Sequence, residues 1–224
     1  MKLVFVTIFI LCSIVFSFGQ NEQAPIVEKE VGYKDWNYKS VQNGTDTNLR
    51  KFTAGKKLVM VVYFAPWCGN WKHDLPFVQA MYDKYKANGF DVIAVGEYDP
   101  VDSMKAHINQ YKLTFPVVWE SDARTARQKT LHYDYRRSVG DTRNWGSPWY
   151  VFLEVDKLEP NGQILAKRAP VVSGELIRPE AEKFIREKLG LAATADLKLN
   201  SLDSTEVCDP AKSSTSLVKS EVKP

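Results

Sequence analysis

The feature that most constrains the fold is the uninterrupted apolar run LVMVVYF at residues 58–64. Seven apolar residues without polar alternation are typical of a strand that is buried on both faces, as in the centre of a parallel sheet. After this run, large apolar side chains recur at spacings of three and four, as on one face of a helix. These are Trp71, Leu75, Val78, Tyr82 and Tyr85. The sequence therefore predicts a strand, a short turn and a helix that begins at or near Cys68.

This arrangement makes Cys68 the candidate nucleophile. At the start of a helix, a thiol meets backbone N–H groups without partners and the positive end of the helix dipole, and both favour thiolate over thiol. A thiolate is the reactive form of cysteine, so thiol chemistry is the first function to consider.

The residues around Cys68 resemble the active site of the thioredoxin superfamily, most closely secreted thiol-disulfide oxidoreductases (redoxins) of the TlpA/ResA type. The matching residues are Trp67, Gly69, Lys72, Asp74 and Pro76. The resemblance covers about residues 35–190. It implies an α/β, thioredoxin-like fold with a central mixed sheet flanked by helices, and it gives Asp74 the role of an acid that relays the thiol proton. Such enzymes carry a second cysteine three residues after the first, and here that position is Trp71.

The remaining chain alternates between predicted strands and helices. The strands are expected at 90–98, 115–119, 149–155 and 163–169, and the helices at 101–111 and 177–189. Residues 35–57 predict a hairpin around Asn43-Gly44, which also begins a glycosylation sequon. Strands that alternate with helices favour parallel pairing with right-handed crossovers.

Residues 120–147 have no repeating apolar period beyond a possible helix at 122–129. They form either a solvated surface loop or a lip beside the active site. The next residues, Gly146-Ser147-Pro148, resemble the Gly-Thr-Pro signature of thioredoxin-like folds. This implies a cis peptide bond before Pro148 and a position for that proline against Cys68, with Pro116 as the alternative cis proline.

The two ends of the chain differ in composition from the middle. Residues 1–19 combine a short basic start, an apolar core and the small-x-small pattern Ser17-Phe18-Gly19, which predicts a signal peptide and a secreted or periplasmic protein. An uncleaved membrane anchor is the alternative. Residues 20–34 are polar with little periodicity, which predicts a mobile arm, and residues 191–224 have the composition of a disordered tail. A thioredoxin-like domain is expected at 35–190.

Composition excludes several kinds of partner. A formal net charge of +3 is too small to indicate nucleic acid. With three histidines and no ligands at useful spacing, the chain predicts no metal site, and without a phosphate-binding loop it predicts no cofactor. Membrane contact is expected only through an uncleaved signal peptide. Three cysteines are present, and if Cys12 leaves with the signal peptide, Cys68 and Cys208 remain. The sequence leaves the oligomeric state open.

Three functions compete. The first is thiol-disulfide redox chemistry through Cys68 alone, with protein or small-molecule thiols and disulfides as partners and a role in cell redox homeostasis. The mixed disulfide would be resolved by an external thiol or by Cys208. The second is a redox-inactive module that binds a peptide or protein partner at the surface of Trp71 and Pro148. The third, a peroxidase, is the weakest, because Val61 and Ala65 occupy positions that its motif assigns to proline and threonine or serine. The residues expected to contact a substrate or partner are Trp67, Trp71, Ser147 and Trp149.

Overall fold

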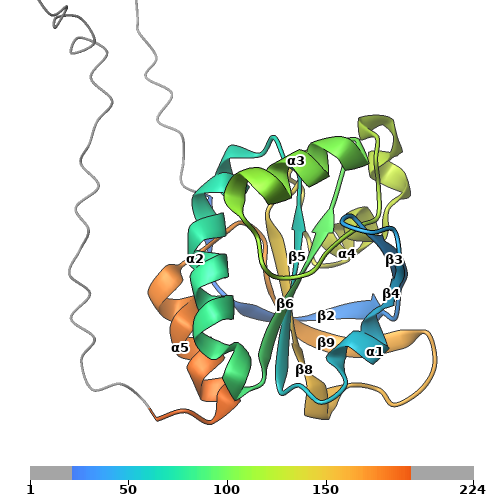
Figure 1. Cartoon of the computed structure of the whole chain (residues 1–224). Coiled ribbons are helices and arrows are strands. Elements are labelled where there is room, and N and C mark those ends of the chain that lie inside the picture. Colours follow the sequence, from blue (N-terminus) through green and yellow to red (C-terminus); the bar gives the residue numbers. More distant parts are fainter. Residues whose placement is uncertain (1–21, 193–224) are drawn as a thin grey trace, which may run out of the picture. The chain divides into compact units, whose positions relative to one another are not determined.

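The central strand is β5 (Leu58–Phe64), and all seven of its residues are buried. In the computed structural model, which describes residues 22–192, β5 pairs in parallel with β6 (Phe90–Gly96) and antiparallel with β8 (Trp149–Glu154). Figure 1 shows β5 in the middle of the molecule. A strand with a neighbour on each side and helices over both faces has no solvent-facing side, and for this reason its sequence is apolar throughout.

The sheet is mixed, as predicted. Its eight strands lie in the order β2 (Val27–Lys34), β9 (Ile164–Val172), β8, β5, β6, β7 (Val117–Trp119), β3 (Asn37–Ser40) and β4 (Asp46–Asn48). The pairs β5·β6 and β6·β7 are parallel and the other pairs are antiparallel. A separate parallel pair joins β1 (Gln23–Ala24) to β10 (Glu175–Leu176).

Helices cover both faces of the sheet (Figure 1). One face packs against α2 (Gly69–Tyr85), α3 (Val101–Tyr111) and α5 (Arg178–Leu189), and the other against α1 (Leu49–Thr53) and α4 (Leu131–Ser138). The short 3-10 helices are η1 (Lys86–Asn88), η2 (Arg124–Lys129) and η3 (Val155–Lys157). This architecture confirms the predicted α/β fold with a central mixed sheet between helices.

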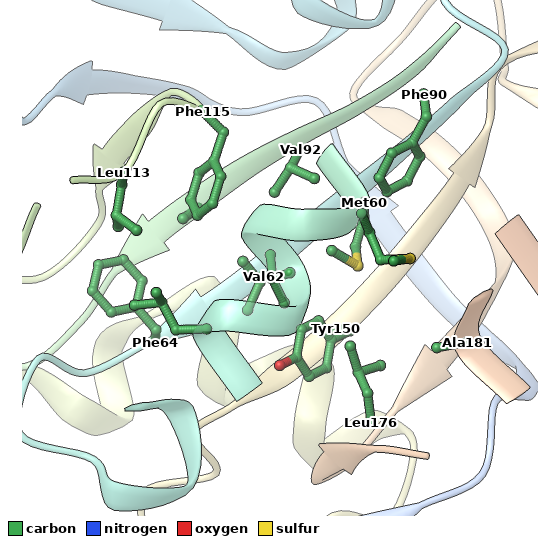
Figure 2. Close-up of a cluster of buried hydrophobic side chains, with 14 of the residues drawn as sticks. Met60, Val62, Phe64, Phe90, Val92, Leu113, Phe115, Tyr150, Leu176 and Ala181 are labelled. Atoms are coloured by element: carbon green, nitrogen blue, oxygen red, sulfur yellow. The ribbon is translucent and has the colours of Figure 1, made fainter. Parts of the chain in front are cut away.

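Alternate residues of β5 contribute to two separate cores. We call them the α2 face and the α4 face of the sheet. Met60, Val62 and Phe64 point to the α2 face, where Figure 2 shows them with side chains of neighbouring strands and helices. Val61 and Tyr63 point to the α4 face. Each core therefore shares its central strand with the other.

The expectation of a mobile arm at residues 20–34 is wrong for its described part. The chain forms β1 and then β2, which pairs antiparallel with β9 along the edge of the sheet. Val31 and Tyr33 are buried, and the Tyr33 hydroxyl lies 2.7 Å from the Tyr63 hydroxyl. An edge strand keeps many polar, exposed residues, so its sequence lacks a strong apolar period.

The segment 120–147 is more regular than its sequence suggests. The helix expected at 122–129 is the 3-10 helix η2, and a further helix, α4, follows it. The Thr130 side chain caps α4 by accepting a hydrogen bond from the Tyr133 backbone N–H at 3.0 Å. The buried face of α4 includes His132 and Arg136, and two polar residues at these positions remove the apolar period by which a helix is normally recognised.

Some predictions fall on residues outside the described range. They concern the signal peptide at 1–19, Cys12, the tail from residue 193 and Cys208. Within residues 22–192, none of the helices combines the length and the apolar character needed to cross a bilayer.

Candidate active site

Cys68 lies at the N-terminus of α2, as the sequence predicts. It is the N-cap residue, its side chain is half-buried, and its backbone N–H donates to the Ala65 carbonyl at 2.9 Å. No side chain caps this helix, and the first N–H groups of a helix have no partner within it. The Cys68 sulfur is therefore placed beside a set of backbone donors.

The loop before β8 meets Cys68 directly. The Ser147–Pro148 peptide bond is cis, which confirms the choice of Pro148 over Pro116. The Cys68 Sγ donates to the Ser147 carbonyl at 3.1 Å, and the Ser147 Oγ accepts from the Ala65 N–H at 3.0 Å. The thiol and the residue before the cis proline thus form one unit, although 79 positions separate them in the sequence.

Trp71 occupies the position of the missing second cysteine and lies in the core. Its side chain is fully buried, its Nε1 donates to His107 Nε2 at 2.9 Å, and its ring centroid lies 5.1 Å from that of Phe64. Trp149 is also fully buried. This corrects the expectation that Trp71 and Trp149 contribute to a binding surface, because neither side chain is accessible to a partner. Of the residues expected there, Trp67 is partly exposed and Ser147 is almost fully buried.

Asp74 is buried, and its carboxylate is held by two donors. Its Oδ2 accepts from the Tyr150 hydroxyl at 2.7 Å and from the Leu176 N–H at 2.8 Å. Burial raises the pKa of Asp74, and these two hydrogen bonds partly oppose that shift. Burial also raises the pKa of Tyr150. The charge of Asp74 raises this pKa further, and the charge of Cys68 adds a smaller increase. Tyr150 is therefore bonded to Asp74 and belongs to the core cluster against which Cys68 packs.

The segment 120–147 forms a rim beside Cys68. The Trp67 ring contacts Trp145 edge to face, with centroids 5.3 Å apart. The Cζ of Arg124 lies 4.9 Å from the centroid of Trp67, and that of Arg127 lies 4.9 Å from the centroid of Trp145. We call Arg124, Arg127 and Trp145 the lip. The sequence allows either a solvated surface loop or a lip beside the active site at residues 120–147, and the positions of these residues agree with the lip.

Comparisons with known proteins agree with this geometry. The model of the AhpC/TSA family matches residues 23–139, more than half of the chain. The chain belongs to the AhpC/TSA family. This family match agrees with the resemblance to the thioredoxin superfamily that the sequence predicts.

Its relatives include thiol-disulfide oxidoreductases. The chain is 36% identical over 61 residues to ResA of Oceanobacillus iheyensis, a match that covers 27% of this chain and 32% of ResA. It is 27% identical over 114 residues to ResA of Bacillus thuringiensis subsp. konkukian, covering 50% and 65%. The chain thus spans about a third to two thirds of the length of these two relatives.

A solved structure of similar fold is a secreted thiol-disulfide isomerase from Corynebacterium glutamicum. It has a TM-score of 0.53 and 15% identity, and the alignment covers 78% of this chain and 95% of that one. At this identity the likeness supports the fold alone.

Asp74 belongs to a cluster of three ionisable side chains that the sequence of this AhpC/TSA member does not reveal. Ligand-type atoms of His73, Asp74 and Glu175 lie within 4.8 Å of one another. His73 Nδ1 lies 3.0 Å from Glu175 Oε2, and its Nε2 lies 3.2 Å from Arg178 Nη2. Both imidazole nitrogens are therefore engaged by protein side chains. Glu175 comes from β10, so residue spacing around Cys68 could not have shown this cluster.

A second unexpected group lies behind the lip on the α4 face. Glu97 is fully buried, and neither carboxylate oxygen has a hydrogen-bond partner among the described residues. Burial raises the pKa of Glu97 well above its usual value, the neighbouring Glu120 carboxylate adds to the shift, and Arg136 opposes it. His132 Nδ1 lies 2.8 Å from the Tyr98 hydroxyl. This AhpC/TSA member therefore keeps several ionisable groups out of water close to its lip.

Proposed function

We propose that this protein carries out thiol-disulfide exchange through Cys68 as its single nucleophile. The observation that supports this best is the contact between the Cys68 sulfur and the Ser147 carbonyl beside the cis Pro148. The thiol is half-buried at a helix N-terminus, which leaves it accessible to a substrate disulfide.

The proposed reaction has two balanced steps. In the first, the Cys68 thiolate attacks one sulfur of a substrate disulfide, the S–S bond of the substrate breaks, and the leaving thiolate takes up a proton. In the second, an external thiolate attacks the mixed disulfide, and Cys68 leaves as thiolate. A disulfide is reformed in the products, so the two steps together exchange one thiol partner for another.

Asp74 and Tyr150 are the candidates for handling the thiol proton. Tyr150 belongs to the core cluster against which Cys68 packs, and its hydroxyl donates to Asp74. A carboxyl group whose pKa is raised by burial holds a proton more readily than an exposed one. We assign to Asp74 the storage of a proton near Cys68 and to Tyr150 the link between them.

The mixed disulfide needs a second thiol from elsewhere. Trp71 fills the place of a local resolving cysteine and is fixed in the core by Phe64 and His107. An external thiol is therefore the proposed resolver, and Cys208, which lies outside the described residues, is the alternative within the chain.

We place this activity outside the cytoplasm and propose that residues 1–19 are removed as a signal peptide. The basic, apolar and small-residue order of this segment supports the assignment. We propose a thioredoxin-like domain that begins with β1 and ends near Gly190, where α5 ends, followed by a separate tail.

The test uses residues 20–224 and the variants Cys68→Ser and Cys208→Ser. Each protein is reduced and mixed with glutathione disulfide, and intact mass reports the mixed disulfide before and after added glutathione. The parent and Cys208→Ser should gain one glutathione at Cys68 and lose it again, whereas Cys68→Ser should show neither change at that site. If Cys68 in the folded parent gained no glutathione, the proposed function would be wrong.

The second candidate is a redox-inactive module that binds a partner beside Trp67 and Pro148. The burial of Trp71 in the second cysteine position favours it, because a local dithiol cycle is impossible. Partner binding that is equal in the parent and in Cys68→Ser, with Cys68 inert to glutathione disulfide, would support this function instead.

A further inference from the structure

The lip carries two arginines whose charges are directed to the neighbourhood of Cys68. Arg124 lies over the ring of Trp67, the residue next to Cys68, and Arg127 lies over Trp145, which touches Trp67. Stacking on an aromatic face fixes a guanidinium group and leaves its N–H edge free for oxygen acceptors.

Neither arginine is neutralised locally. Within residues 22–192, no carboxylate oxygen lies within the 4.0 Å ion-pair distance of Arg124 or Arg127. Arg127 donates to the backbone carbonyl and side-chain oxygen of Asn144, both uncharged acceptors. Arg143 of the same segment differs, since its guanidinium group pairs with Asp141 at 2.8 Å.

A third positively charged side chain lies on α2, the helix that follows Cys68. Lys72, one turn after Cys68, is exposed and has no ion-pair partner among the described residues. Cys68 is thus accompanied by unpaired positive charge on α2 and on the lip. Any partner joined to Cys68 by a disulfide must place the residues next to its own cysteine in this region, because consecutive Cα atoms are only ~3.8 Å apart.

We propose that the protein partner is a peptide segment with carboxylate side chains close to its cysteine, which Arg124 and Arg127 bind. Guanidinium groups match carboxylates in shape and charge, and two neighbouring arginines favour more than one acidic residue. This inference rests on the proposed thiol-disulfide exchange for its setting, but the charge preference is a property of the lip itself.

The first test compares three cysteine peptides that differ only in the residues beside the cysteine, which are Glu, Gln or Lys. Each peptide, as its mixed disulfide with 5-thio-2-nitrobenzoate, reacts with the reduced protein, and the rate at which the peptide is transferred to Cys68 is measured by intact mass. The parent should react fastest with the Glu peptide. Arg124→Gln and Arg127→Gln should each lower the Glu-peptide rate roughly twofold to fivefold, as expected for exposed ion pairs, and lower the Gln-peptide rate by a smaller factor.

Arg137→Gln is the matched control. Arg137 is an exposed arginine on α4 of the same segment, and its replacement removes the same charge without changing either arginine–tryptophan stack. Its Glu-peptide rate should equal that of the parent. Thermal unfolding of all variants confirms that they fold. Added salt should reduce the preference for the Glu peptide in the parent.

The second test separates the lip from the chemistry. Binding of the same peptides with serine in place of cysteine is measured by fluorescence anisotropy on Cys68→Ser, with and without Arg124→Gln and Arg127→Gln. Tighter binding of the Glu peptide that weakens with either arginine variant supports the inference even if Cys68 proves unreactive. Equal binding of the Glu and Lys peptides, or a preference that survives both substitutions, would overturn it and leave the exchange reaction untouched.

Discussion

The two faces of the central sheet differ in the polarity of their buried side chains, although they share β5. The α2 face is mostly apolar, with the hydrophobic cluster of Figure 2, and its buried hydrogen bonds include those from Trp71 to His107 and from Tyr150 and Leu176 to Asp74. The α4 face combines apolar residues with tyrosines and buried ionisable groups, among them Glu97, His132 and Arg136.

This difference separates two tasks of the molecule. The α2 face fixes the helix that carries Cys68 mainly by apolar packing, and its buried ionisable groups include Asp74 and His107. The α4 face fixes the lip by hydrogen bonds and ion pairs, which require specific partners and respond to pH. Substitutions on the two faces should therefore affect the free energy of unfolding and its pH dependence in different ways.

The largest effect is expected on the α2 face from Trp71→Cys. The substitution removes a fully buried indole and leaves His107 without its donor, so the free energy of unfolding should fall by about 3 to 5 kcal/mol, as for other large aromatic truncations. Urea unfolding followed by circular dichroism measures this. Trp71→Phe keeps a ring and should lose less.

The same variant gains a second thiol one turn after Cys68. At a temperature where it remains folded, it should reduce insulin faster than the parent. An unchanged unfolding midpoint would show that Trp71 is not the packing centre that its burial indicates.

His107 should make the stability of the α2 face sensitive to acid. Burial, with help from the charge of Lys72, lowers the pKa of His107 to about 4. Because the unfolded state binds this proton below about pH 6.5, stability should be lost as pH falls from about 6.5 to about 4, by up to about 3 kcal/mol.

In His107→Gln, the amide oxygen can still accept from Trp71 and cannot be protonated in this range. The free energy of unfolding, measured at a series of pH values, should fall less steeply towards low pH in this variant than in the parent. Parallel curves would contradict the assignment.

On the α4 face, Gly146→Ala should cost about 2 to 3 kcal/mol. Gly146 has φ +61°, and an added Cβ would overlap the Arg136 guanidinium group, which is fixed by a hydrogen bond to the Arg143 carbonyl. Gly140→Ala is the matched control, because Gly140 also has a positive φ, +87°, but has open space around its Cα. Thermal unfolding of the two variants isolates the contact with Arg136, and equal losses would show that this contact is unimportant.

Glu97 should give the α4 face the opposite pH response to that of His107. Its raised pKa means that the folded state keeps a proton that the unfolded state releases above about pH 4.3. Stability should therefore be lost as pH rises above that value, with a slope of at most about 1.4 kcal/mol per pH unit.

Glu97→Gln should remove this slope, whereas Glu28→Gln, at an exposed position on β2, should keep it. Unfolding free energies between pH 5 and pH 8 measure the difference. The same slope in Glu97→Gln and the parent would mean that Glu97 does not hold the proton.

The sequence predicts the α2 face better than the α4 face, for a physical reason. Apolar runs and their spacing identify β5 and α2, and the resemblance of Gly146-Ser147-Pro148 to the Gly-Thr-Pro signature locates the cis Pro148. The same helical spacing groups Trp71 with core residues and therefore predicts that it is buried. The surface role expected for Trp71 conflicts with this spacing.

The lip and the buried groups depend on contacts between distant parts of the chain. Arg124 stacks on Trp67, and Asp74 is held by donors from β8 and β10, so no local pattern contains these pairs. On α4, polar side chains take the inward positions, which hides the helix from any search for apolar periodicity.

The outer strand β2 also bears on how this protein behaves at high concentration. It ends the order of the described sheet, and the edge of a sheet exposes backbone groups to which a second molecule can add a strand. Glu28, Lys29 and Glu30 place alternating charges along this edge, and the pairing with β9 shifts register between Glu30 and Tyr33, where Gly32 has φ +55°. Charge and a bulge make such an edge a poor template, so intermolecular sheet growth from β2 is disfavoured and the folded protein resists self-association there.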